Sequence, residues 1–189
     1  MEPKMTKIFH FVGLGGIGMS ALARVLLQKG HKVQGSDAQL SPLLADLQKE
    51  GALVQIGHSG DALKEEMTIV YSSAVKESNV EMKRAKELKL PLLHRSDLLH
   101  RLMDEKNALL VTGTHGKTTT TALLAEVFLK AKLNPSFVVG GILASEKTNG
   151  RSGSGDYFIA EADESDGSFL KTPSFGAIVT NLENDHLDY

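Results

Sequence analysis

The stretch Leu109-Leu-Val-Thr-Gly-Thr-His-Gly-Lys-Thr-Thr-Thr-Thr121 joins a short apolar run to a segment with helical periodicity. Residues 108–111 are all apolar and break at Gly113, which is typical of a buried strand. The helix that follows is expected to place on one face Leu123, Leu124, Val127, Phe128 and Ala131. Loop N–H groups and a helix dipole both favour negative charge, so the stretch predicts an anion site in an α/β fold.

Two side chains give this loop a nucleotide-binding character. Lys117 can reach terminal phosphate oxygens, and the Thr118 hydroxyl is placed to hold Mg²⁺. The glycines at 113 and 116 are two residues closer together than in the general P-loop pattern, so a strict pattern search misses the motif. The alternative is a plain strand-to-helix turn with a surface lysine.

The composition is that of an ordinary soluble globular chain. Its 189 residues suffice for one large or two small domains, and 41% of them are hydrophobic. The net charge of −2 predicts no general attraction to nucleic acid. No apolar run has the length of a membrane span, and no cysteine is present, which excludes disulfides and fits a cytoplasmic location.

A second glycine loop lies near the N-terminus. The run Gly13-Leu-Gly-Gly-Ile-Gly18 follows an expected strand at residues 7–14 and opens a helix with Ile17 among its inward residues. A second strand at 31–36 ends at Asp37, which is placed to bind a ribose hydroxyl. This is the dinucleotide-type fingerprint in its required context. It predicts a nucleotide-diphosphate site, with NAD as the default ligand, and the alternative is a structural turn that binds nothing.

Further elements complete two α/β regions. Strands are expected at 53–56, 67–71 and 92–94, and Ser78-Asn-Val-Glu81 predicts a capping box before a helix. We therefore predict a Rossmann-like parallel sheet in residues 1–104, and an incomplete P-loop α/β domain in residues 105–189. Residues 145–155, rich in Ser, Gly and Asn, are expected to form a loop.

Acidic residues follow an apolar strand in the second region. The strand at 157–160 leads into Glu161, Asp163, Glu164 and Asp166, and an acid beside a phosphate-binding strand is a common Mg²⁺ ligand. A solvated acidic loop is the alternative. The last strand, 177–180, brings Asn181 and His186 to the same edge, where His186 is either a metal ligand or a loop histidine.

Together these stretches resemble the Mur ligases, the ATP-dependent amide ligases of peptidoglycan synthesis. The matching stretches are GLGGIGMSALA (13–23), GSD (35–37), IGH (56–58), YSSAVKESN (71–79), HRSDLL (94–99), GTHGKTTTT (113–121), AEADESDGSFL (160–170) and TNLENDHLDY (180–189). Within the family the resemblance is closest to the enzymes that join L-alanine to UDP-N-acetylmuramate. A muropeptide-recycling sister enzyme, which joins a tripeptide to the same UDP-sugar, shares GTHGKTTT but departs at the first glycine loop.

The resemblance implies roles for particular residues. The first domain is expected to bind a UDP-sugar instead of NAD, through Gly15, Gly16, Ile17, Gly18, Met19, Ser20, Asp37, His58, Ser72 and Ser73. ATP is expected to bind Gly113, Thr114, His115, Gly116, Lys117, Thr118, Thr119 and Asn181. Magnesium is expected at Thr118, Glu161 and His186, and the residues implied to act in catalysis are Lys117, Glu161 and His186.

The implied reaction is ATP-dependent amide formation with an acyl phosphate, using the small-molecule substrates UDP-N-acetylmuramate and L-alanine in the bacterial cytoplasm. Family members have three domains, so the sequence is interpreted as a fragment that lacks ligase activity by itself. An NAD-binding oxidoreductase and a non-catalytic nucleotide-binding module are the other classes considered. The sequence leaves the oligomeric state open.

Overall fold

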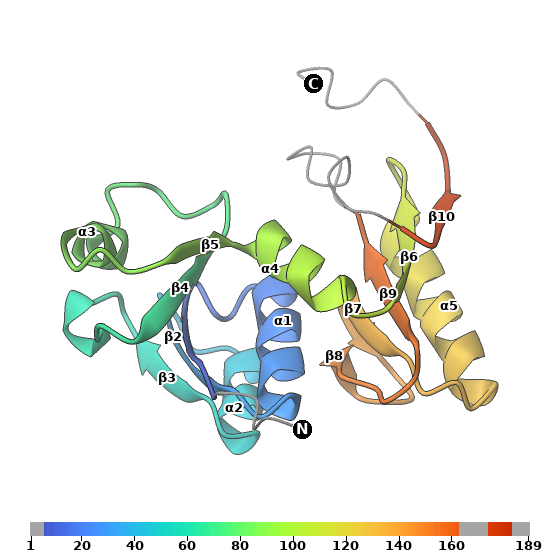
Figure 1. Ribbon diagram of the computed structural model, residues 1–189, viewed down its shortest axis with the longest axis horizontal. Helices are drawn as coiled ribbons and strands as arrows, with labels where there is room; N and C mark the ends of the chain where they lie inside the picture. The colour runs from blue at the N-terminus through green and yellow to red at the C-terminus, as the bar shows by residue number, and fades with distance from the viewer. Residues whose placement is uncertain (1–5, 163–173, 183–189) are drawn as a thin grey trace. The chain divides into compact units, whose positions relative to one another are not determined.

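The computed structural model describes residues 6–162 and 174–182 (Figure 1). The chain forms two compact units that divide between Leu98 and Leu99, six residues before the expected boundary at 104. Each unit is built on its own five-stranded sheet. The predicted α/β class with a Rossmann-like first sheet is confirmed.

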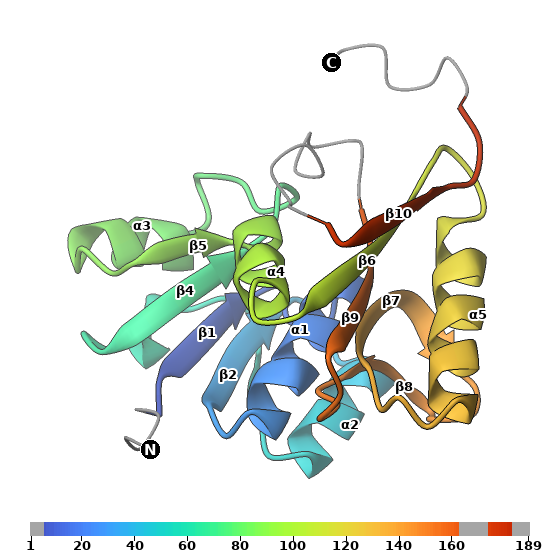
Figure 2. The ribbon, with the colours of Figure 1, turned by 45° about the vertical axis from the view of Figure 1, so that its right-hand side comes forward.

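The first unit alternates strands and helices along the chain. Its elements are β1 (Ile8–Val12), α1 (Ile17–Gln28), β2 (Lys32–Asp37), α2 (Pro42–Lys49), β3 (Leu53–Ile56), the 3₁₀ turn η1 (Gly60–Ala62), β4 (Met67–Tyr71), α3 (Val80–Glu87), β5 (Leu92–His94) and α4 (Arg95–Met103), which runs across the division. The strand order is β3-β2-β1-β4-β5, with every neighbouring pair parallel. Helices α1 and α2 cover one face and α3 covers the other (Figure 2).

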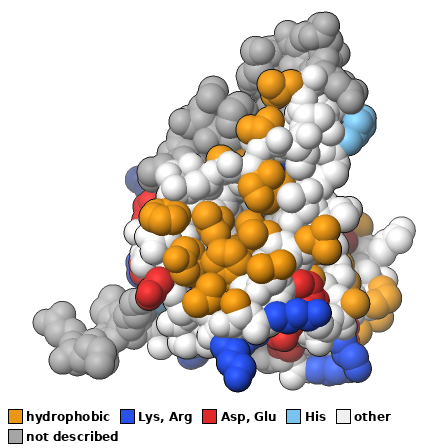
Figure 3. Space-filling view, turned by 90° about the vertical axis from the view of Figure 1, so that its right-hand side faces the viewer, with side chains coloured by type: hydrophobic (Ala, Val, Ile, Leu, Met, Phe, Trp, Pro, Cys, Tyr) orange, Lys and Arg blue, Asp and Glu red, His pale blue; other side chains and the backbone are white. Residues whose placement is uncertain are grey.

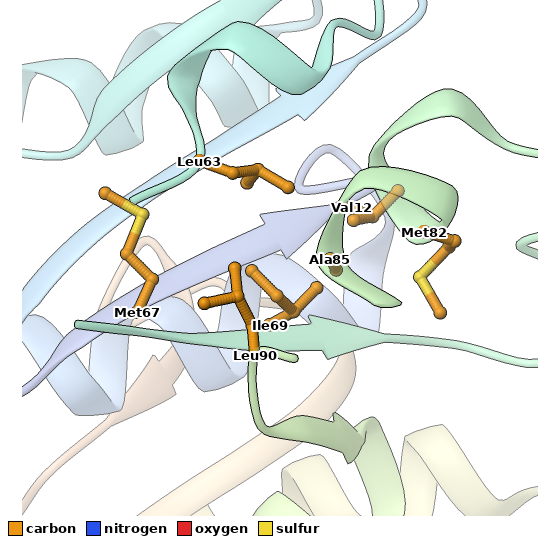
Figure 4. Close-up of a cluster of buried hydrophobic side chains, with 7 residues drawn as sticks. All are labelled: Val12, Leu63, Met67, Ile69, Met82, Ala85 and Leu90. Carbon is orange, nitrogen blue, oxygen red and sulfur yellow. The ribbon is translucent and has the colours of Figure 1, made fainter. Parts of the chain in front are cut away.

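Helix α3 packs on the sheet through a cluster of apolar side chains (Figure 4). The cluster consists of Val12, Leu63, Met67, Ile69, Met82, Ala85 and Leu90. Its members come from β1, β4, α3 and the segments that flank them, so burial of this apolar surface holds α3 against β1 and β4.

The expected capping box at the start of α3 is wrong. Asn79, not Ser78, is the N-cap, and its Oδ1 accepts hydrogen bonds from the N–H groups of Glu81 and Met82 at 2.8 and 3.4 Å. The Glu81 side chain does not return to the cap, because it turns into the interior and is fully buried. The side chains it meets there come from β1, β2 and the segment after β3, so a tertiary contact overrides a local one.

The Glu81 carboxylate accepts hydrogen bonds from three side chains. Oε1 lies 3.2 Å from His10 Nε2, and Oε2 lies 2.5 Å from Ser36 Oγ and 2.8 Å from His58 Nδ1. Burial alone raises the pKa of the Glu81 carboxyl, but hydrogen bonds from His10, Ser36 and His58 outweigh burial and hold that pKa below its ordinary value. Glu81 is therefore an ionised carboxylate inside the first unit.

The second unit has a mixed sheet. Its elements are β6 (Asn107–Thr112), α5 (Lys117–Lys130), β7 (Ser136–Leu143), β8 (Thr148–Arg151), β9 (Tyr157–Glu161) and β10 (Gly176–Val179). The order is β10-β6-β9-β7-β8, in which only the β7–β8 pair is antiparallel among the described strands. The loop expected over residues 145–155 therefore contains strand β8. Pairing with β7 makes this strand, since Thr-Asn-Gly-Arg has no strand pattern of its own.

The expected inward face of α5 is also wrong in part. Leu124 and Phe128 pack on the core with the buried Ala125, but Leu123 and Val127 are 63% and 61% exposed. Thr121 is buried and polar, and its hydroxyl donates to Lys117 O at 2.8 Å, so the hydrophobic pattern did not reveal the face that meets the sheet. Figure 3 shows apolar side chains gathered on the outer face of the side that carries α5 and β10. No helix in the described residues is long and apolar enough to cross a membrane.

Close packing of β1 and β2 requires a glycine at position 35. A Cβ on Gly35 would lie 2.6 Å from Phe11 O and 2.9 Å from Leu14 Cβ. We predict that Gly35→Ala destabilises the first unit by about 1–3 kcal/mol, measured by hydrogen exchange of the β1 amides. Gly18→Ala is the control, because its nearest neighbour would be Arg95 Nη1 at 3.8 Å and alanine favours the helix. Equal stability of the two variants would show that a side chain at position 35 does not clash with Phe11 and Leu14.

Ionised Glu81 predicts a pH-dependent stability of the first unit. A depressed pKa in the folded state stabilises that state above the ordinary glutamate value of about 4.3, and the gain is lost as pH falls through the folded pKa. We expect the free energies of unfolding of the wild type and Glu81→Gln, from hydrogen exchange of β1 and β4 amides, to differ by about 1–3 kcal/mol near neutral pH. That difference should shrink as pH falls below about 4. A constant difference would show that the carboxylate charge does not stabilise the fold.

Candidate functional site

The glycine loop after β1 is held by the end of β2. Gly13 has φ of 82°, and the N–H groups of Gly13 and Leu14 both donate to Ser36 O at 2.9 Å. Gly16 caps α1 without a side-chain partner, and the first turn of that helix contains no acidic residue. The N-terminus of α1 therefore offers backbone N–H groups and a positive dipole end to an anion.

Asp37 is oriented by the same loop. Its Oδ2 accepts a hydrogen bond from Gly15 N at 2.8 Å, and its Oδ1 lies 3.4 Å from Gln39 N. A side chain at position 15 would meet Asp37 Oδ2 at 2.9 Å, so the fingerprint glycine makes room for the carboxylate. The placement fits the expected role of Asp37 as a ribose ligand.

A cleft of about 780 Å³ opens at the carboxyl ends of the strands. It lies where the strand order reverses between β1 and β4, the usual position of ligands in open α/β sheets. Five residues expected to bind the UDP-sugar line it, namely Gly16, Met19, Asp37, His58 and Ser72. The β4–α3 connection also contributes residues that were not expected, namely Ala74, Val75, Lys76, Ser78, Asn79 and Val80.

The other expected UDP-sugar residues lie around the cleft without lining it. Ser20 is fully buried and its hydroxyl donates to Ile17 O at 2.9 Å. Ser73 Oγ lies 3.1 Å from His94 Nε2. Ile17 was expected to face inward, but 39% of it is exposed, because it stands at the first position of α1. Gly18 follows it in the same turn.

Lys76 is the functional candidate that residue-level reasoning missed. It lines the cleft and is the only Lys or Arg among the described lining residues, so it can approach an anionic ligand. The signal was present, since Lys76 lies in a polar connection that follows a buried strand at the carboxyl edge of the sheet. The loop's length hid it, because four residues separate Tyr71 from Lys76.

The second loop follows β6, the strand between β9 and β10. Gly113 and Gly116 have φ of 126° and 83°, which turns successive peptide groups into an anion-binding shape. Gly116 is the N-cap of α5. Lys117 Nζ lies 2.7 Å from Gly113 O and 3.3 Å from Thr114 O, so the ammonium group sits at the loop.

The end of β10 clamps this loop. The Asn181 side chain binds both backbone groups of His115, with Oδ1 3.0 Å from His115 N and Nδ2 3.1 Å from His115 O. Thr180 Oγ1 donates to His115 O at 2.6 Å. A side chain at Gly113 would collide with Thr180 and Asn181, so the glycine permits this close approach. Asn181 thus holds the loop through the backbone of His115, and its expected contact with ATP stays a prediction.

Glu161 reaches the same loop from the end of β9. Its Oε2 accepts a hydrogen bond from Thr118 Oγ1 at 3.1 Å, and its Oε1 accepts one from Gly140 N at 2.6 Å. A Cβ at position 140 would lie 2.9 Å from Glu161 Oε2 and 3.0 Å from Thr118 Oγ1. Strand β7 therefore passes so close to the carboxylate that a side chain at position 140 would displace Glu161 or Thr118, a contact that the sequence pattern did not reveal.

The hydroxyl of Thr118 and the carboxylate of Glu161 fit a magnesium ion. Both are hard oxygen ligands, and Mg²⁺ is usually held by one or two such groups together with water and phosphate. In residues 6–162 and 174–182 no cluster of three His, Asp or Glu side chains could hold a metal. The expected third ligand, His186, and the acids Asp163, Glu164 and Asp166 lie outside the described residues. Thr119 is exposed in the first turn of α5.

Two family models match the chain one after the other. Residues 8–107 match "Mur ligase family, catalytic domain" and residues 111–189 match "Mur ligase middle domain". A protein named UDP-N-acetylmuramate–L-alanine ligase from Protochlamydia amoebophila is 51% identical over 180 residues, which are 95% of this chain and 40% of that protein. One of the same name from Aquifex aeolicus is 44% identical over 183 residues, again with 40% of its length covered. The chain thus spans about two fifths of these curated relatives.

Solved structures agree with these matches. The UDP-N-acetylmuramate-alanine ligase of Thermotoga maritima has a TM-score of 0.88 and 37% identity, over 97% of this chain and 43% of that one. The Neisseria meningitidis ligase named for UDP-N-acetylmuramate and L-alanyl-gamma-D-glutamyl-meso-diaminopimelate also has a TM-score of 0.88, with 29% identity over 96% of this chain and 62% of that one. With its two glycine loops, its strand order and these matches, the chain belongs to the Mur ligase family.

Proposed function

We propose that this chain contributes the UDP-sugar site and part of the ATP site of a ligase that joins L-alanine to UDP-N-acetylmuramate. The observation that carries the proposal is the presence of two anion-binding loops of different chemistry. The loop after β1 is paired with a ribose-type acid, Asp37, and the loop after β6 is paired with Lys117, Thr118 and Glu161. One suits a nucleotide diphosphate, and the other suits a triphosphate with its metal.

The relatives favour L-alanine as the amino acid. Curated relatives that bear the L-alanine ligase name are 44–51% identical to this chain. The Neisseria structure, named for the tripeptide, matches the fold equally well but is 29% identical, against 37% for the Thermotoga alanine ligase. The sequence difference therefore supports the L-alanine reaction over tripeptide ligation, whereas the fold is common to both.

The first unit would hold the UDP part of the sugar nucleotide. The pyrophosphate would lie at the N-terminus of α1, and the ribose would lie near Asp37, whose carboxylate Gly15 orients. His58, Ser72 and Lys76 line the rest of the cleft and would complete the site. A uracil nucleotide would replace the NAD that the glycine fingerprint suggests by default.

In the second unit the loop residues would position and neutralise ATP. Backbone N–H groups between Gly113 and Thr118 would bind phosphate oxygens. The Lys117 ammonium group would move from the loop carbonyls to contact the terminal phosphate. Thr118 and Glu161 would hold Mg²⁺, with His186 as the further ligand that the family resemblance implies. The metal would supply charge neutralisation at the phosphates.

The proposed reaction has two steps. The lactyl carboxylate of UDP-N-acetylmuramate attacks the γ-phosphorus of ATP, which forms an acyl phosphate and releases ADP. The neutral amine of L-alanine then attacks the activated carbonyl, and the tetrahedral intermediate collapses with loss of phosphate, while the amine proton passes to water. The chain's own groups act by positioning the two anions and offsetting their charge, so Lys117 and the loop N–H groups lower the barrier without taking a proton. The bacterial cytoplasm is the proposed location.

Calorimetric titration separates the ligand classes in the first unit. We expect the 189-residue chain to bind UDP-N-acetylmuramate and not NAD, because its resemblance to the Mur ligases implies a uracil nucleotide in the cleft. Binding of NAD alone would overturn the proposal in favour of an oxidoreductase. A folded sample that binds neither ligand would also refute the proposal that this chain forms the UDP-sugar site.

Substitution of Lys117 tests the second loop. We expect Lys117→Ala to weaken binding of ATP with Mg²⁺ by about tenfold to a hundredfold, since it removes a charge-assisted hydrogen bond. Lys130→Ala, at the last position of the same helix, is the matched control and should leave the affinity unchanged. Equal affinity of both variants, measured by calorimetry, would contradict the assignment of the phosphate-binding lysine.

A further inference from the structure

The proposed function gives no role to the buried carboxylate of Glu81. The Glu81 carboxylate is fully buried beneath the cleft and comes from α3, which supplies no part of either glycine loop. Its three partners include His58, the one among them that also lines the cleft. The bond between Glu81 and His58 therefore connects the interior with the ligand site.

The protons of this network can be assigned from its chemistry. Gln34 Nε2 lies 3.2 Å from Ala62 O and 3.0 Å from His10 Nδ1. The carbonyl oxygen only accepts, so the amide group of Gln34 faces it with its nitrogen, and the second amide hydrogen is donated to His10 Nδ1. His10 Nδ1 is then an acceptor, so the ring carries its hydrogen on Nε2 and donates it to Glu81 Oε1.

The other carboxylate oxygen orients His58. Glu81 Oε2 accepts from Ser36 Oγ at 2.5 Å and from His58 Nδ1 at 2.8 Å, and an ionised carboxylate has no hydrogen to give. His58 must therefore carry a hydrogen on Nδ1. Ser36 Oγ also lies 2.9 Å from His58 Nδ1, which fixes the ring from a second direction.

One nitrogen of His58 is left for a ligand. The ring is 30% exposed and lines the cleft, and Nε2 has no partner among residues 6–162 and 174–182. We propose that Glu81 is a positioning residue that keeps the hydrogen of His58 on Nδ1 and presents Nε2 as an acceptor to a donor group of the nucleoside, a hydroxyl or an imide N–H. The inference rests on the proposed UDP-sugar site.

The tautomer of His58 gives a readout that needs no ligand. In ¹⁵N-labelled protein at a pH where the ring is neutral, the imidazole nitrogen shifts should show the Nδ1–H form. In Glu81→Gln the amide has one oxygen for two imidazole donors, so one ring must move its hydrogen. Since His10 Nδ1 is occupied by Gln34, His58 is the ring that should change to the Nε2–H form. Ser36→Ala is the control, because it keeps the carboxylate and should keep the Nδ1–H form.

A double-mutant cycle then tests the effect on the ligand. Glu81→Gln should weaken binding of UDP-N-acetylmuramate about tenfold in the wild-type background and should cause no further loss in a His58→Ala background. An Nε2–H ring in the wild type would overturn the inference, and so would an equal loss in both backgrounds. Absence of any UDP-N-acetylmuramate binding by the wild type would refute the proposed function and the role of Nε2, while the tautomer still reports on Glu81.

Discussion

The first unit depends on a carboxylate buried in its interior. Glu81 accepts hydrogen bonds from side chains of β1, β2 and the segment after β3, so four parts of the chain meet at two oxygen atoms. A buried charge is costly unless it is hydrogen-bonded, and here both carboxylate oxygens accept hydrogen bonds from a total of three donors. These hydrogen bonds, together with the apolar cluster beneath α3, hold that helix and the β4–α3 connection that lines the cleft.

A second carboxylate has a comparable place in the other unit. Glu161 stands at the end of β9 and binds both the hydroxyl of Thr118 and the backbone of Gly140. Glu161 is only partly buried. In the proposed magnesium site its carboxylate would exchange the hydrogen bond from Thr118 for contact with the metal ion. The contrast between the two acids is one of burial. Glu81 is fully buried, which suits it to orient another side chain. Glu161 is partly exposed beside the second glycine loop, which suits it to hold a cation.

Sequence reasoning succeeded where local chemistry and chain order suffice. Both glycine loops follow the strands that were expected to precede them. Asp37 and Glu161 lie at strand ends as expected, because parallel strands bring their carboxyl ends to one edge. It failed where a partner distant in the chain decides. Glu81 was assigned to a helix cap, Leu123 and Val127 to the interior and residues 145–155 to a loop. Burial of Thr121 and the pairing of β8 depend on surfaces that no local pattern encodes.

By itself the sequence determined the fold class and the two glycine loops, because the glycines, Lys117, Thr118 and the strand-end acids follow expected strands in the order that such loops require. The family followed from the resemblance of longer stretches, such as GTHGKTTTT (113–121) and AEADESDGSFL (160–170). Only the tertiary structure showed that a side chain at position 35 or 140 would contact its neighbours too closely. It alone showed that Asn181 holds the second loop through His115 and that Lys76 lines the cleft. It also placed His58 Nδ1 beside the Glu81 carboxylate, on which the proposed tautomer rests. The reason is that these properties arise from contacts between residues more than twenty positions apart, whose distances the folded backbone alone sets.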